Sequence, residues 1–192
     1  MCKFLVDRGA EIRYFEADPA QQIWFGFNSS ATMFLCVNSN GDNSQFALSE
    51  KLKCLKYLID KKLVTLPQAP ERFPFSGMYP KALEFLLDNH YLSVNDRIKN
   101  GPPILFYAAT NSEFGAELVE ILIKRGADVK ATNSEQTILY FAAPTGKLNA
   151  AELARFKNVF STLIKSGADL NGLLNRVGDE NFKKWLISQG AK

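Results

Sequence analysis

Apolar residues recur along the chain at the three- and four-residue spacing of amphipathic helices. In residues 104–109 they fall on one face, and Pro103 just ahead sets the backbone angle at which a helix begins. Residues 118–123 are almost wholly aliphatic, and Gly126 can take the left-handed conformation that ends a helix. The polar segment 110–115 lies between them. The pattern therefore predicts two antiparallel helices joined by a turn.

The same sequence motif recurs elsewhere in the chain. An aliphatic helix that closes on Gly-Ala occurs at residues 4–12, 121–129, 163–170 and 185–191. Residues 136–143 also repeat residues 102–109 almost position for position. Internal repetition of this kind predicts a stack of similar helical hairpins that share one extended core.

Weaker periodicity predicts further helices. They are expected at residues 31–37, 52–62, 79–90, 150–165 and 181–191. The helices at 52–62 and 79–90 resemble the second helix of a hairpin whose Gly-Ala has been lost. Three prolines within residues 66–78 leave room only for a short or irregular helix there. The last helix carries lysines among its apolar residues, as a solvated closing helix should.

Two sequence motifs give these repeats a family resemblance. Gly101, Leu105, Ala108 and Ala109, and again Thr137, Leu139, Ala142 and Ala143, fit a helix-opening pattern Gly-x-Thr-Pro-Leu-His-x-Ala-Ala. Residues 126–129 and 167–171 fit the closing pattern Gly-Ala-Asp-Val-Asn. The chain resembles the ankyrin-repeat family, most specifically over residues 95–171. Phe106 and Tyr140 replace the usual histidine, so the hydrogen bonds of that position are not expected.

The resemblance implies an all-α, ankyrin-type solenoid of helical hairpins with irregular loops, in one domain spanning residues 1–192. We expect repeats at 14–66, 67–95, 96–131 and 132–171, and a C-terminal cap at 172–192. Residues 1–13 form either a partial repeat, left when a longer protein was trimmed, or an improvised cap.

The resemblance also implies a non-catalytic scaffold for protein–protein interaction, which binds a partner through the concave face of its first helices and its turn tips. The expected contacts in the tips and first helices are Arg97, Lys99, Asn100, Tyr107, Asn111, Asn133, Ser134, Gln136 and Phe141. Tyr107 and Phe141 would anchor a partner well, although packing between repeats explains them equally. One residue of each aromatic pair, 106–107 and 140–141, should face inward.

A second candidate surface lies in residues 21–28, which hold three aromatic residues including Trp24. This segment is either a binding finger or a plug for the end of an irregular stack. Three further hypotheses stay open. The chain could be a regulatory module trimmed from a larger enzyme or channel, or a bacterial effector or toxin inhibitor. A third alternative is a hydrolytic enzyme within the irregular N-terminal half, whose activity would depend on His90.

Composition and charge narrow the remaining functions. The net charge of +3 is too small to indicate a nucleic-acid partner. No apolar run reaches the roughly 18 residues that span a bilayer, and charges near the start exclude a signal-type segment. We therefore expect no membrane insertion, and a location in the cytoplasm or in a host cell reached by a specialised route.

Few residues are candidates for catalysis or metal binding. The three cysteines have no metal-like spacing and are expected to be reduced, partly buried thiols. His90 is the only histidine and lies at a predicted helix end, where a capping or packing role is expected. The aspartates Asp60, Asp88, Asp128 and Asp169 repeat with the architecture, which favours a turn or capping role over acid–base chemistry. We predict no enzyme activity, no metal site and no cofactor.

Overall fold

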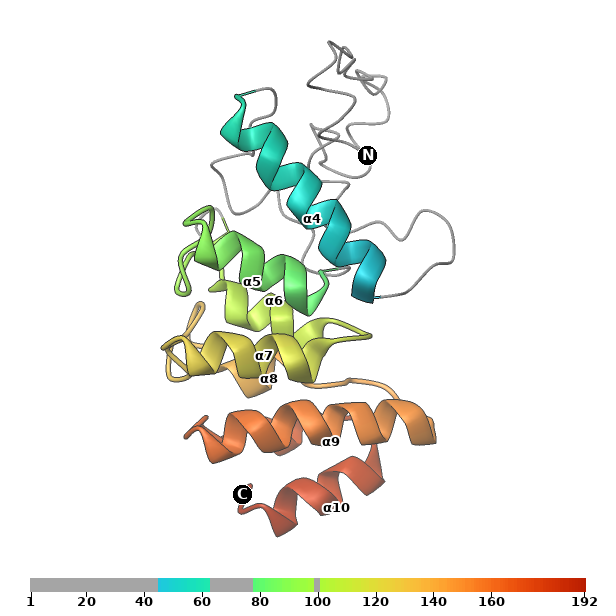
Figure 1. Cartoon of the computed structure of the whole chain (residues 1–192). Helices are drawn as coiled ribbons and strands as arrows, with labels where there is room; N and C mark the ends of the chain where they lie inside the picture. Colours follow the sequence, from blue (N-terminus) through green and yellow to red (C-terminus); the bar gives the residue numbers. More distant parts are fainter. Residues whose placement is uncertain (1–44, 63–77, 99–100) are drawn as a thin grey trace, which may run out of the picture. The chain divides into compact units, whose positions relative to one another are not determined.

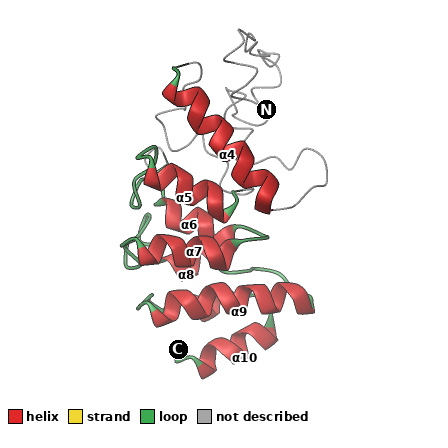
Figure 2. Ribbon diagram, in the orientation of Figure 1, coloured by secondary structure: helices red, strands yellow, loops and turns green. Residues whose placement is uncertain are grey.

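The computed structural model describes residues 45–62, 78–98 and 101–192. The chain divides into two compact units, Met1–Leu92 and Ser93–Lys192, which we describe separately. All regular elements in the described residues are helices joined by loops (Figure 2). They are α4 (Gln45–Asp60), α5 (Pro80–Asp88), α6 (Ile104–Thr110), α7 (Gly115–Lys124), α8 (Ile138–Ala142), α9 (Ala150–Lys165), the 3-10 helix η3 (Leu173–Asn175) and α10 (Glu180–Ser188). The predicted all-α fold is confirmed.

The C-terminal unit is built from two layers of helices. Helix α6 packs against both α7 and α8, and α7 packs against α9. Within this unit, Figure 1 shows α7, α9 and α10 in front, with α6 and α8 behind them. The first helix of each hairpin therefore lies in one layer and the second helix in the other. This is the stack that the repeated sequence pattern predicts.

Local sequence signals set the ends of these helices, and the one at Pro103 was predicted. Pro103 precedes α6, and Thr137 caps α8 by accepting a hydrogen bond from the Tyr140 N–H. Helix α9 spans exactly the predicted residues 150–165. Asn149 and Glu152 form a capping box at its start, in which each side chain accepts from the other residue's backbone N–H.

The second helices share one closing geometry. After α7, Gly126 has φ +90° and the Ala127 N–H donates to the Leu122 carbonyl at 2.9 Å. This is the Schellman motif, and it recurs after α9 and α10 at Gly167 and Gly190. The predicted helix stop at Gly126 is therefore confirmed.

Helix α5 ends in the same way without a glycine. His90 has φ +58°, and the Tyr91 N–H donates to the Leu86 carbonyl at 2.9 Å. The histidine thus stands where the other repeats have glycine, one position past the C-cap residue Asn89. Its expected role at the helix end is confirmed, with an exposed side chain in a left-handed backbone.

We expect His90→Gly to stabilise the protein by about 1 kcal/mol, because glycine removes the steric cost of the left-handed conformation. His90→Ala keeps that cost and should leave stability nearly unchanged. Gly126→Ala should destabilise by about the same 1 kcal/mol, since no atom within 4 Å would meet its Cβ and only the backbone cost remains. Urea denaturation of the three variants measures these changes. Equal effects of His90→Gly and His90→Ala would contradict the backbone argument.

The N-terminal unit contains α4 and α5, which pack together. Pro80 occupies the first turn of α5, as the sequence predicts. The Lys81 ammonium donates to the Ser49 hydroxyl on α4 at 3.2 Å. Cys54 on α4 is disulfide-bonded. The expectation of reduced thiols is therefore wrong for this residue, and cysteine usage no longer supports a reducing compartment.

The last repeat differs from the expected single closing helix. Gly172, at φ +70°, leads into η3, and α10 follows after a short loop. Residues 172–192 therefore form a shortened hairpin, with η3 in the place of a first helix. Phe182 of α10 is fully buried, and its ring lies 5.1 Å from that of Phe160 on α9. Trp185 stacks on the outer side of Phe182 at 5.4 Å.

Asp179 joins the loop before α9 to the start of α10. One carboxylate oxygen accepts from the Phe182 N–H at 2.9 Å and caps α10. The other accepts from the Leu148 N–H at 3.1 Å, in the preceding loop. The bond from Leu148 contributes most to lowering the pKa of Asp179 below 3.8, and the bond from Phe182 adds to it. Next to it, the Gly178 N–H donates to the Pro144 carbonyl of the same loop at 3.0 Å.

The lowered pKa of Asp179 predicts a pH-dependent contribution to stability. Because the folded pKa lies below the unfolded value of 3.8, the contribution is complete above that value and is lost as pH falls through the folded pKa. Asp179→Asn should therefore lower the denaturation midpoint at pH 7, and the gap from the wild type should shrink toward pH 3. The exposed Glu180→Gln is the matched control, expected to change little at either pH. A gap that stays constant between pH 7 and pH 3 would contradict the assignment.

Several predictions lie outside the described residues. These are the partial repeat or cap at residues 1–13, the aromatic segment at 21–28, the helix at 31–37 and the irregular helix within 66–78. The two interpretations of residues 1–13, and those of residues 21–28, stay predictions.

Candidate protein-binding face

The turn tips of the C-terminal unit are short two-stranded bridges. One pairs Arg97 with Pro103, and the next pairs Asn133 with Gln136 through two backbone hydrogen bonds of 2.9 and 3.0 Å. Between the latter pair, Ser134 and Glu135 have φ of 47° and 68°. Two left-handed central residues define a type I′ turn, in which non-glycine residues are strained. The tip presents both exposed side chains to solvent.

Arg97 links the two tips. One guanidinium nitrogen donates to the Gly101 carbonyl of its own tip, and the other donates to the Thr132 carbonyl at the base of the next tip, each at 3.2 Å. Both acceptors are backbone carbonyls, so neither hydrogen bond pairs the exposed guanidinium with an opposite charge. The structure thus fixes the position of this arginine without neutralising it.

Aromatic side chains lie along the first helices. Phe106 of α6 is fully buried and the neighbouring Tyr107 is half-buried, which confirms for this pair that one residue faces inward. On α8, Tyr140 and Phe141 are both half-buried, so the expectation fails for that pair. The Phe141 ring lies 5.4 Å from that of Phe106 and 6.1 Å from that of Tyr107. Packing between repeats and partial exposure thus coexist in Tyr107 and Phe141.

Tyr140 faces the following repeat. The guanidinium of Arg176, at the end of η3, lies over the Tyr140 ring at 5.5 Å from its centre. In the preceding repeats a longer first helix packs at this place, whereas η3 is only one turn long. The Arg176 guanidinium covers the Tyr140 ring there instead. Tyr107, Phe141 and Tyr140 form a line along the first helices, which we call the aromatic row. With the turn tips, it makes up the first-helix face.

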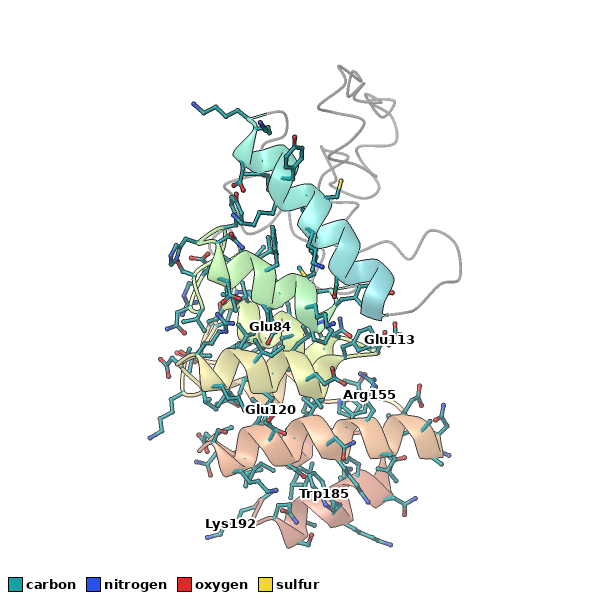
Figure 3. The ribbon with its side chains drawn as sticks, viewed as in Figure 1. Glu84, Glu113, Glu120, Arg155, Trp185 and Lys192 are labelled. Atoms are coloured by element: carbon teal, nitrogen blue, oxygen red, sulfur yellow. The ribbon has the colours of Figure 1, made fainter. Side chains whose placement is uncertain are left out.

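Asn111 does not contribute to this face. It is 1% exposed, and its side-chain oxygen accepts from the N–H groups of Glu113 and Phe114 at 2.9 and 2.7 Å. Arg155 of α9 donates to its backbone carbonyl at 3.1 Å, from the side of α9 that faces α7 (Figure 3). Asn111 therefore shapes the connection between α6 and α7, and we leave it out of the proposed surface.

The other predicted contacts fall into three groups. Arg97, Ser134 and Gln136 are exposed, and Asn133, Tyr107 and Phe141 are half-buried. Lys99, Asn100 and Trp24 lie outside the described residues. Within the described tips and first helices, the structure brings together the residues that the repeat pattern placed at equivalent positions.

Sequence reasoning missed Tyr140 and Arg176. The sequence did contain a signal for these two residues. Residues 167–171 repeat the closing pattern of residues 126–129, and in a repeat protein that pattern is followed by the first helix of another hairpin. From the sequence we predicted only a closing helix in the segment after residue 171. A three-residue helix has no apolar periodicity to reveal it.

Two of the four repeating aspartates have the expected turn role, whereas Asp60 accepts from the Lys56 ammonium at 3.3 Å and Asp88 is the last residue of α5. Asp128 accepts from the Lys130 N–H at 2.9 Å, and Asp169 accepts from the Asn171 N–H at 3.0 Å. Both are Asx turns that direct the chain from a second helix toward the next tip. Among the described residues, no three His, Cys, Asp or Glu side chains are grouped as metal ligands would be. None of the helices described here has the length and hydrophobicity to cross a bilayer.

Stacked helical hairpins with bridged turn tips define a helical repeat protein. A family model described as ankyrin repeats, in three copies, matches residues 75–173, slightly more than half of the chain. The chain belongs to the ankyrin-repeat family. Repeats of this family generally mediate protein–protein interaction and are typically non-catalytic. Among curated proteins, none matches the sequence.

Proposed function

We propose that this protein is a non-catalytic scaffold that binds one partner protein through its first-helix face. The observation that carries the proposal is the partial exposure of Tyr107 and Phe141 on neighbouring first helices, with their rings in contact. Aromatic anchors of this kind bury a large area at a low entropic cost, which is why they dominate many interfaces.

The turn tips extend the proposed surface. Ser134 and Glu135 hold left-handed conformations at a cost, and a cost of this kind is often retained where a side chain is used. Arg97 fixes the spacing of two neighbouring tips through its hydrogen bonds. Rigid tips lose little freedom on binding, so they favour recognition of a partner.

The proposal keeps the predicted organisation of one domain with repeats at 14–66, 67–95, 96–131 and 132–171 and a cap at 172–192. The hairpins α6–α7 and α8–α9 fall within the third and fourth of these repeats, which supports that division. No cofactor and no nucleic acid takes part in the proposed function.

The proposed location is the cytoplasm, or a host cell reached by a specialised route. The disulfide at Cys54 argues against it, because the cytosol keeps thiols reduced. Electrophoresis of the chain from its native cells, with free thiols blocked at lysis and with and without reductant, tests the point. Identical mobility in both lanes supports the location, and faster migration without reductant contradicts it.

The function is tested by affinity capture from native-cell lysate with the tagged full-length chain, followed by mass spectrometry. We expect a dominant partner that the double variant Tyr107→Ala/Phe141→Ala captures at least tenfold less, since two anchors are removed. Circular dichroism must first show that the variant is folded.

Ile187→Ala is the matched control, because this side chain is 56% exposed on α10, away from the first helices. It should capture the partner as the wild type does. A partner retained by the double variant would move the site away from the first-helix face. Loss of the partner in both variants would contradict a role specific to the aromatic row.

A further inference from the structure

The aromatic row is joined to an arginine at its N-terminal end. The Arg97 guanidinium donates to the Gly101 carbonyl at 3.2 Å. The Tyr107 hydroxyl lies beside the same glycine, 3.7 Å from the position that a Cβ would occupy there. Tyr107 in turn contacts Phe141 of the next repeat. Arg97 and two aromatic rings thus form one continuous line across two repeats.

The row ends on a second arginine in the following repeat. Tyr140 precedes Phe141 on α8, and the Arg176 guanidinium lies over its ring. Cation–π stacking holds this guanidinium in place without removing its charge. An aromatic surface with a positioned arginine at each end therefore spans three successive repeats.

Charge along this line has one sign. Helices α6, α8 and η3 contain no acidic or basic residue. Arg97 and Arg176 are exposed, and within the described ranges neither has a carboxylate within 4 Å. The acidic residue of the second tip, Glu135, belongs to the turn and not to the helices. The ends of the row therefore offer two unneutralised, oriented guanidinium groups.

We propose that the aromatic row receives an acidic segment of the partner protein, with an apolar or aromatic side chain on the rings and a carboxylate at each arginine. This inference rests on the proposed function and adds the chemistry of the partner. Arginine suits the task because its planar fork binds a carboxylate through two hydrogen bonds. Since both guanidinium groups are already held, little side-chain entropy is lost on binding.

The repeat spacing limits the length of the segment. Neighbouring helices in a packed stack lie about 10 Å apart, so two repeat steps place the backbones of the two arginines about 20 Å apart. Both side chains reach the repeat between them, Arg97 at Thr132 and Arg176 at Tyr140, so the two guanidinium groups lie closer together than that. An extended chain rises about 3.3 Å per residue, so about six residues is the upper limit. The expected ligand therefore carries two acidic positions no more than about six residues apart, with an apolar residue between them.

The test is selection of a random twelve-residue peptide library, displayed on phage, against the full-length chain. We expect the selected peptides to be enriched in Asp or Glu at two positions flanking an apolar residue. Synthetic copies of these peptides should bind Arg97→Ala and Arg176→Ala roughly tenfold more weakly than the wild type. Their affinity should also fall as salt is raised.

Two controls separate local chemistry from general charge. The substitutions Arg97→Lys and Arg176→Lys keep the positive charge but remove the planar guanidinium that binds a carboxylate through two hydrogen bonds. Each lysine variant should therefore bind the peptides more tightly than the alanine variant but more weakly than the wild type. Lys165→Ala removes an exposed charge from the end of α9, outside the first-helix face, and should leave the affinity unchanged. Equal losses in Lys165→Ala and the arginine variants would overturn the proposal.

Other outcomes also decide between hypotheses. Selected peptides without acidic enrichment, but lost in Tyr107→Ala/Phe141→Ala, would overturn the acidic partner and leave the proposed function in place. A library that yields no binder contradicts the acidic segment, and an empty affinity capture contradicts the scaffold as well. Arginine-dependent binding of a labelled oligouridylate, tighter than that of any peptide at 150 mM salt, would replace the protein partner with a nucleic acid.

Discussion

Gly178→Ala is expected to destabilise the C-terminal unit by about 3 kcal/mol, at the upper end of the cost of overpacking. A Cβ at this position would stand 2.5 Å from the carbonyl carbon of Thr145 and closer still to its oxygen. Both are backbone atoms, so no side-chain rotation relieves the clash. The two loops must move apart, which also stretches the hydrogen bond from Gly178 to Pro144.

The matched control is Gly146→Ala in the facing loop. No atom lies within 4 Å of a Cβ there, and its φ is not in the left-handed region. The change should be neutral or stabilising by up to about 1 kcal/mol, because alanine restricts the unfolded chain more than glycine does. Thermal unfolding followed by circular dichroism compares the two. Similar unfolding temperatures for both variants would show that the loops separate freely.

Phe182→Ala is the second large effect, with an expected loss of about 3–5 kcal/mol. The side chain is fully buried between α9 and α10, and its ring contacts those of Phe156, Phe160 and Trp185 at 5.9, 5.1 and 5.4 Å. Removing it leaves a cavity at the centre of the contact between the last two second helices. Because each repeat is stabilised mainly by its neighbours, the loss should fall on α10 first.

Hydrogen exchange locates that loss along the chain. In Phe182→Ala the amides of residues 180–188 should exchange faster, while those of α6 and α7 keep most of their protection. Ile187→Ala on the same helix removes an exposed side chain and should change exchange little. Uniform acceleration across the whole C-terminal unit would mean that the repeats unfold as one body.

The sequence predicted the fold best where a residue's own backbone preference decides the geometry. Pro103 and Gly126 mark the start and end of a hairpin by their allowed angles alone. The left-handed conformation of His90 could not be predicted in this way, because histidine does not prefer it. There the recurring hydrogen bond to Leu86 holds the backbone against the preference of the residue.

The candidate face was predicted in part for a similar reason. Repeat alignment places Tyr107 and Phe141 at equivalent positions, and that information is local to each motif. The contact of Tyr140 with Arg176 joins residues from different repeats, and it depends on η3 being one turn long. Asn111 was misplaced because a polar residue after a helix either reaches solvent or caps the next turn, and only the structure distinguishes the two.

The stack of Trp185 on Phe182 has a practical consequence for spectroscopy. Figure 3 labels Trp185, which lies on α10. The chain holds two tryptophans, and the other is Trp24. With Trp24→Phe, the remaining indole becomes the chain's single strong fluorophore, placed on the last hairpin. Its emission should shift to longer wavelength when α10 detaches and water reaches the ring. The protein thus carries a built-in optical reporter of its C-terminal edge, and labelling is not needed to see whether that edge opens before the rest.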